Sequence, residues 1–143
     1  MKKFIVLFMA VFALTLVACG GDDGVEYPVE YTRATVVSSN VDGDTVKLTV
    51  EGEGFYPMTA EVTFVNGTMT AFEITDHRET ANWGEVLIDA GDLQQAIIDN
   101  QSNISGIDLG DYVVVAGGTV SATAEALIDI ASTAVEHFGK HYE

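Results

Sequence analysis

The dipeptide Asn66-Gly67 separates two runs of alternating apolar and polar residues, at 59–65 and 68–75. Such a pair between alternating runs is the strongest short signal for a β-hairpin, because both central residues of the turn need positive φ. The alternation also means that each strand buries one face and exposes the other. An antiparallel sheet is therefore expected at the centre of the fold.

Two further strands are expected upstream of this hairpin. Residues 31–38 are rich in β-branched side chains, and residues 45–51 alternate between apolar and polar positions. The turn signal Asp42-Gly43-Asp44 separates them. A glycine-rich loop is expected at 52–54, before the hairpin begins.

Helical periodicity appears only in the second half of the chain. Residues 92–101 carry apolar residues at helical spacing, with Asp92 placed to act as an N-cap or first-turn acid. A long amphipathic helix is expected near the C-terminus, with Ser121 as its N-cap. Its apolar positions are Ala124, Leu127, Ile128, Ala131, Val135 and Phe138. Strands followed by helices predict a single small α+β domain, with helices packed on one face of an antiparallel sheet.

The stretch 112–121 combines a β-branched run, the pair Gly117-Gly118 and the start of the last helix. It predicts a buried strand, a glycine turn and then a helix N-terminus. Backbone N–H groups converge at such a turn, and the helix dipole there favours negative charge, so the turn would suit a phosphate. Thr119 would hold its hydroxyl beside that phosphate.

The N-terminus reads as a bacterial lipoprotein signal. Residues 1–18 combine Lys2-Lys3 with an apolar run that is too short to span a bilayer comfortably. The run ends at a lipobox-like sequence before Cys19, which is the lone cysteine of the chain. We therefore expect cleavage before Cys19, lipidation of Cys19 and tethering outside the cytoplasmic membrane. Residues 19–30 would form a flexible acidic spacer, and residues 31–143 the folded domain.

Charge and cysteine content exclude several classes of protein. A single cysteine cannot form a disulfide framework or a cysteine-based zinc or iron–sulfur site. Loss of Lys2 and Lys3 on processing would leave four basic residues against 22 acidic ones, a formal charge of −18. A surface of this charge repels nucleic acid and anionic lipid headgroups. No nucleic-acid partner and no metal site are expected.

Two motifs, in this order of elements, resemble the family of FMN-binding domains. That family includes the covalently flavinylated subunits of the sodium-translocating NADH:quinone reductase and related complexes, and extracellular flavin lipoproteins. The first motif has the pattern His-x-Glu-Thr followed by Gly-Glu. Its residues here are His77, Glu79, Thr80, Gly84 and Glu85. The second is the family's flavinylation motif, whose glycine, alanine and threonine align here with Gly117, Gly118 and Thr119, followed by Val120 and Ser121.

The resemblance implies that a flavin transferase esterifies Thr119 with FMN, and that the loop of the first motif lies near the flavin. The second motif departs from the family pattern, because apolar Val113 and Ala116 stand where the family has Asp and Ser, and Gly118 replaces an alanine. Three outcomes therefore remain open: covalent FMN, non-covalent flavin, or a domain that has lost flavin.

The side chains suggest roles for a bound flavin ring. Trp83, in a polar loop, is a candidate for stacking, whereas packing within the fold is favoured for Phe55 and Tyr56. His77 and Glu79 could hydrogen-bond the polar edge of the ring or move a proton. The expected function is a membrane-anchored electron carrier, served by unknown redox partners, rather than an enzyme with its own turnover. The alternative is a surface lipoprotein that keeps the fold as a binding or structural module without flavin.

Overall fold

The computed structural model describes residues 34–115 and 118–142, and only the backbone at Val114–Val115 and Gly118–Thr119. They belong to one compact unit, Tyr31–Glu143. The predicted signal peptide, the lipidation site Cys19 and Gly117 lie outside the described residues. Within those residues, no helix has the length and apolar character needed to cross a membrane.

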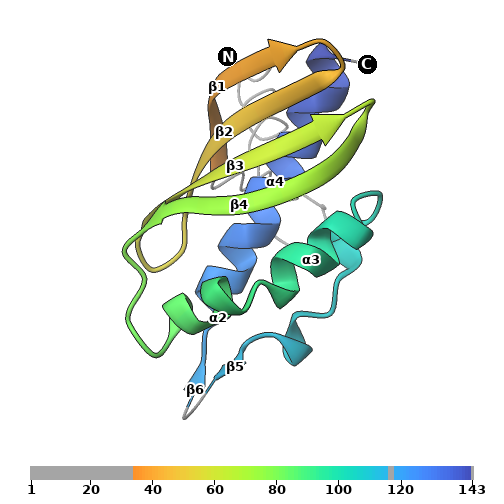
Figure 1. The fold of residues 1–143 in the computed structure, drawn as a ribbon. Coiled ribbons are helices and arrows are strands. Elements are labelled where there is room, and N and C mark those ends of the chain that lie inside the picture. Colours follow the sequence, from red (N-terminus) through yellow and green to blue (C-terminus); the bar gives the residue numbers. More distant parts are fainter. Residues whose placement is uncertain (1–33, 116–117, 143) are drawn as a thin grey trace, which may run out of the picture. The chain divides into compact units, whose positions relative to one another are not determined.

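Four antiparallel strands form the main sheet in their order along the chain (Figure 1). They are β1 (Ala34–Asp42), β2 (Thr45–Glu53), β3 (Pro57–Val65) and β4 (Thr68–His77). The predicted hairpin is confirmed, since Asn66 and Gly67 join β3 to β4 with φ values of 50° and 82°. The strands are longer than expected, and β1 and β4 form the two edges of the sheet.

One face of this sheet is apolar and the other is polar. The buried side chains of β2 are Val46, Leu48 and Val50, and those of β3 alternate in the same way. The opposite face carries threonines and charged residues. On it Lys47 donates a 2.7 Å hydrogen bond to Glu61, which raises the pKa of Lys47 above its ordinary value. The clean period of two explains why this part of the fold followed from the sequence.

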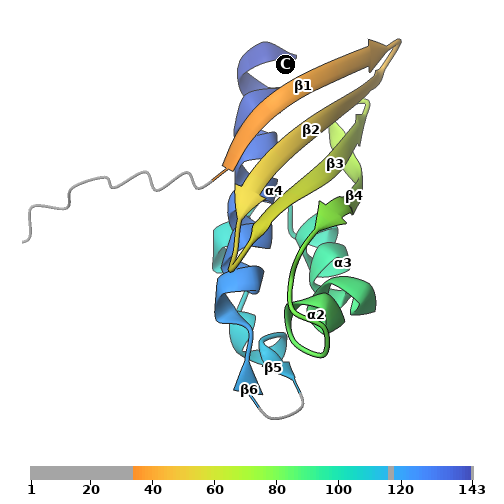
Figure 2. The same ribbon diagram turned by 90° about the vertical axis from the view of Figure 1, so that its left-hand side faces the viewer.

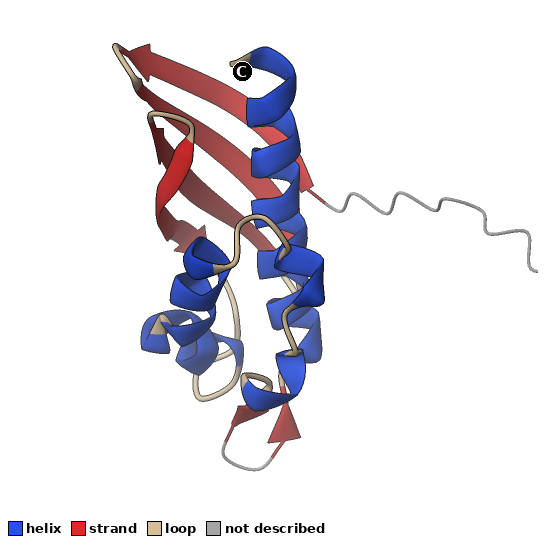
Figure 3. Cartoon of the chain, turned by 90° about the vertical axis from the view of Figure 1, so that its right-hand side faces the viewer, coloured by secondary structure: helices blue, strands red, loops and turns tan. Residues whose placement is uncertain are grey.

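Three helices pack on the sheet, which makes the protein a single α+β domain as predicted. They are α2 (Gly84–Ala90), α3 (Asp92–Asp99) and the 21-residue α4 (Ser121–His141), which runs across the sheet in Figure 3. The buried stripe of α4 joins the apolar side chains of β2 and β3. Near its end Phe138 stacks on Phe64, with ring centroids 4.3 Å apart. Two short 3-10 turns, η1 (Ile104–Gly106) and η2 (Leu109–Asp111), follow α3.

The structure corrects two local predictions and confirms a third. Gly52 belongs to β2 rather than to a loop, and a Cβ atom there would lie 2.5 Å from Cγ1 of Ile130 in α4. The glycine therefore allows the close approach of helix and sheet. The loop predicted around Glu85 contains α2, which is too short for its periodicity to show clearly. The expected first-turn acid is confirmed, since Asp92 is the first residue of α3 and the N-cap is Gly91.

The stretch before α4 also differs from prediction. The buried strand is reduced to β5 (Val114–Val115), which pairs with β6 (Gly118–Thr119) in a two-residue ladder. Gly118 thus belongs to strand β6 rather than to a turn between a strand and a helix. The N-cap of α4 is Val120, and Ser121 is the first residue of the helix. The predicted Ser121 cap is therefore wrong.

Candidate functional site

A pocket of about 210 Å³ collects residues of both sequence motifs at one end of the domain. Its lining comes from the β2–β3 loop, the β4–α2 loop and the residue that precedes α4. These residues are Phe55, Glu79, Thr80, Trp83, Gly84 and Val120. In Figure 2 the β2–β3 loop, α2, the β5–β6 hairpin and the first turn of α4 all lie at the same end of the domain. Five of the predicted site residues therefore share one cavity.

The β4–α2 loop is held in shape by its own backbone. The N–H of Trp83 donates to the carbonyl of Thr80 at 3.0 Å, and the N–H of Val86 donates to the carbonyl of Trp83 at 3.0 Å. Asn82 between them has a φ of 66°, a left-handed conformation in which asparagine is enriched. This turn brings Trp83 to the N-cap position of α2, next to Gly84 at the pocket wall.

Glu79 is a buried carboxylate, 7% exposed, at the wall of this pocket. Its Oε2 accepts a 2.8 Å hydrogen bond from the Thr123 hydroxyl, and its Oε1 accepts a 3.2 Å bond from the Tyr56 N–H. Thr123 lies in the first turn of α4, where the helix dipole also favours a negative charge. Glu79 therefore joins the β4–α2 loop to both the β2–β3 loop and α4.

Two glycines make room for this buried carboxylate. A Cβ atom on Gly84 would lie 2.4 Å from Oε2 of Glu79 and 2.7 Å from Oγ1 of Thr123. A Cβ atom on Gly54 would lie 2.9 Å from Oε1 of Glu79. Real Cβ atoms essentially never come within 3.0 Å of another heavy atom, so a side chain at either position would force the Glu79 carboxylate to shift. Gly84 was predicted to adjoin the flavin, and its contacts assign it a packing role as well.

The aromatic residues around the pocket are exposed. Phe55, Tyr56 and Trp83 keep 67%, 46% and 42% of their surface accessible. The prediction that Phe55 and Tyr56 pack within the fold is therefore wrong. Exposed aromatic rings beside a mainly apolar pocket are unusual for residues that only stabilise a core.

Other predicted site residues lie apart from the pocket lining. His77 ends β4 opposite Met58, and its buried Nδ1 has no hydrogen-bond partner among the described residues. Thr119 pairs with Val114 in the β5–β6 ladder, directly before the pocket residue Val120. The N–H of Val120 donates to the carbonyl of Val113 at 2.9 Å, so this amide is already used within the fold.

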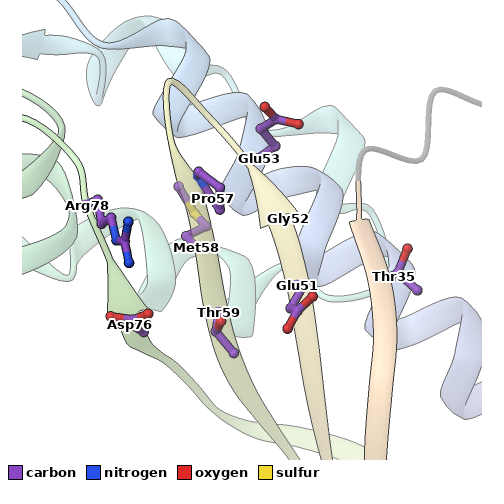
Figure 4. Close-up of a pocket in the computed structure, with 9 residues that line it drawn as sticks. All are labelled: Thr35, Glu51, Gly52, Glu53, Pro57, Met58, Thr59, Asp76 and Arg78. Carbon is purple, nitrogen blue, oxygen red and sulfur yellow. The ribbon is translucent and has the colours of Figure 1, made fainter.

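A larger hollow of about 550 Å³ lies at the end of the sheet but contains none of the predicted site residues. Figure 4 shows Glu51 and Glu53 on β2, with Asp76 and Arg78 across β3 from them. In residues 34–115 and 118–142, no three His, Cys, Asp or Glu side chains are grouped so that they could hold a metal ion. The hollow is thus an open, mainly polar surface, and the smaller pocket at Glu79 is the better site.

Sequence reasoning missed Thr123 and Gly54 as parts of this site. A polar residue at 123, directly before the apolar stripe of α4, was a usable signal, because a buried hydroxyl needs a partner. The chain matches no family model, no curated protein and no solved structure. The geometry of the pocket and the two sequence motifs therefore carry the functional argument.

Proposed function

We propose that this chain is a membrane-anchored, extracytoplasmic electron carrier that holds FMN through a phosphoester to Thr119. One observation carries the proposal: the pocket is lined by Glu79, Thr80 and Gly84 of the first motif together with Val120, the neighbour of Thr119. The two motifs are far apart in the sequence, and a shared cavity is what a common ligand would require.

The pocket residues suit part of a flavin. Its lining is mainly apolar, and the exposed rings of Phe55 and Trp83 offer faces for stacking on a planar ring system. Its 210 Å³ is below the roughly 300–1,000 Å³ of sites that enclose whole ligands, so the pocket would take only a part of FMN. Bound FMN would supply the electron-transfer chemistry, and the chain would hold and orient it.

The phosphate would depend on backbone donors. The pocket lining includes no Lys, Arg or His. The first N–H groups of an α-helix have no intrahelical partners, so those of α4 are the donors nearest in sequence to Thr119. Covalent attachment would offset the repulsion between a phosphate and an acidic protein. Cys19 would carry the lipid anchor, a flavin transferase would be the modifying enzyme, and nucleic acid is not an expected partner.

Co-expression with a flavin transferase tests the proposal. The wild-type protein should give a fluorescent band that survives denaturing electrophoresis, and its intact mass should include one FMN. Thr119→Ala should abolish the band. Thr68→Ala, which removes an exposed hydroxyl outside both motifs, should keep it. An unmodified mass together with a colourless native protein would refute the proposal.

A second function is favoured by the contacts of Glu79. Both carboxylate oxygens already accept hydrogen bonds from Thr123 and Tyr56, so this residue has a role in the fold without any ligand. The domain would then be a surface module that has lost flavin, consistent with apolar Val113 and Ala116 in the second motif. A visible spectrum of the protein from its original host separates the two, because only a flavoprotein is yellow.

A further inference from the structure

A second groove, of about 540 Å³, lies between strand β4 and the helices α2 and α3. It shares no lining residue with the pocket at Glu79. Residues 70–74 of β4 form one wall, and residues of α2, α3 and their junction form the other. Because β4 is an edge strand, no further strand of the described sheet pairs with its outer side (Figure 1).

Gln101 shows that this edge pairs with an amide group. Its side-chain Oε1 accepts a 2.7 Å hydrogen bond from the Met69 N–H, and its Nε2 donates to the Met69 carbonyl at 3.3 Å. The side-chain amide therefore takes the place of a peptide group on a neighbouring strand. The Gln101 amide covers the edge only at Met69, and the groove begins at the next residue of β4, Thr70. An uncovered edge is a template for an added strand.

Gln94 supplies an acceptor that lacks a donor. The residue is 8% exposed and lines the groove, and its Nε2 donates to the Ile88 carbonyl at 2.8 Å. Its Oε1 is buried and has no hydrogen-bond partner among the described residues. A buried acceptor without a partner is costly, so an N–H group brought into the groove would be stabilised there.

The remaining lining residues define the chemistry of an occupant. Ile74, Ile88 and Ile98 offer apolar surface, whereas the exposed Glu73 and Asp89 carry carboxylates at the same groove. No Lys or Arg is among the residues that line it. An occupant with alternating apolar and basic side chains would match both features, because successive side chains of an extended segment point to opposite sides.

We propose that this groove binds an extended, basic segment of a partner protein, which adds to β4 as a fifth strand. Backbone hydrogen bonds to the edge would supply affinity, and apolar and basic side chains would supply selectivity. A donor on the segment would pair with Oε1 of Gln94 once that buried side chain turns toward the groove. This site is independent of flavin, so its failure and the failure of the proposed redox function can be distinguished.

The test is a titration of ¹⁵N-labelled protein, residues 19–143 with Cys19→Ser, with the acetylated and amidated pentapeptide Lys-Val-Lys-Val-Lys. We expect shifts confined to the amides of residues 70–74 and the side-chain amide of Gln94. Hydrogen exchange at the β4 edge should slow when the peptide is bound. The matched peptide Glu-Val-Glu-Val-Glu should bind more weakly, because it would bring carboxylates next to Glu73 and Asp89.

Two variants with one control assign the contacts. Glu73→Lys should lower the affinity for the basic peptide by about twofold to tenfold, the range expected when an exposed ion pair becomes a repulsion. Glu51→Lys makes the same charge change outside the groove and should have a smaller effect. Gln94→Met keeps the side-chain length but removes the acceptor, and should weaken binding by about twofold to tenfold.

Several results would overturn the proposal. Shifts spread over the polar face around Lys47 would indicate charge attraction without a site. Equal binding of the two peptides, or no shift at millimolar peptide, would exclude a basic strand. Shifts of residues 70–74 that depend on protein concentration alone would instead assign the groove to a second copy of this chain. The hydrogen-exchange measurement needs no variant, so it decides even if Gln94→Met does not fold.

Discussion

The hydroxyl of Thr123 lies 2.8 Å from Oε2 of Glu79 and donates a buried hydrogen bond that joins α4 to the β4–α2 loop. The same carboxylate accepts a hydrogen bond from the N–H of Tyr56, and the missing side chains of Gly84 and Gly54 leave room for it. Three segments that are distant in the sequence thus meet at one carboxylate. The shape of the pocket depends on this junction, whether or not a flavin is bound.

Replacing Thr123 by valine should destabilise the protein by about 1.5–3 kcal/mol. Valine has nearly the same shape, but it removes the donor to a buried carboxylate, and hydrogen bonds to charged groups fall in this range. Thr123→Ser keeps the hydroxyl and should retain most of the stability. Urea unfolding of the three proteins measures the free energies. Equal stability of the valine and wild-type proteins would show that this bond contributes nothing.

Gly84→Ala should be destabilising by about 1–3 kcal/mol, the usual cost of forcing an extra group into a packed site. The new Cβ would meet Glu79 and Thr123 at distances that require the junction to shift. Gly110→Ala is the matched control, since a Cβ atom on Gly110 would meet only the exposed side chain of Asp108, at 3.1 Å. Thermal unfolding should separate the two variants. Equal melting temperatures would mean that the loop adjusts freely.

Gln101→Leu should expose the edge of β4 at Met69. The variant loses both hydrogen bonds to the Met69 backbone, and each such bond contributes about 0.5–1.5 kcal/mol. Hydrogen exchange of the Met69 amide should become faster, while the amide of Val62 on the inner strand β3 should stay protected. If exchange at Met69 is unchanged, the glutamine does not act as a substitute strand.

The end of α4 should make the fold sensitive to mild acid. The pKa of His137 lies below its ordinary value, first because of burial and then because of the nearby positive charges of His141 and Lys140. The folded state therefore binds this proton less well than the unfolded state. The contribution of neutral His137 to the free energy of unfolding is therefore present above a pH of about 6.5 and is lost as the pH falls below that value.

Melting temperatures measured between pH 8 and pH 5.5 check this expectation. The wild-type melting temperature should fall more steeply than that of His137→Gln, which cannot titrate. At pH 8 His137 is neutral in either state, so the difference between the two proteins there gives the baseline. Parallel curves would show that His137 titrates alike in the folded and unfolded states.

The main sheet was predictable because its signals are local. A period of two along 45–51, 59–65 and 68–75, with Asn66-Gly67 at the turn, depends on neighbours within a few residues. The long helix α4 was predictable for the same reason. The helix α2 was missed because seven residues span barely two turns. The strand before Thr119 was overestimated because a β-branched run indicates a tendency to form strands without providing a partner.

The candidate site was predictable only in part. Glu79 and Gly84 were singled out by a motif and Trp83 as an aromatic residue in a polar loop, and the structure brings them to one pocket with Val120. The motif did not indicate that Phe55 would be exposed at this pocket, or that Thr123 would hold the carboxylate of Glu79. These contacts depend on how α4 docks against the two loops, which no local pattern encodes.

The sequence by itself determined which residues alternate, where the chain turns and which face of α4 is apolar, because these properties arise from backbone conformation and side-chain chemistry within a few residues. Only the tertiary structure decided which polar groups meet. The pairs Glu79 with Thr123 and Gln101 with Met69 join residues 44 and 32 positions apart. Burial of the apolar faces brings such residues together, and each buried polar group is then stable only where the fold provides a partner.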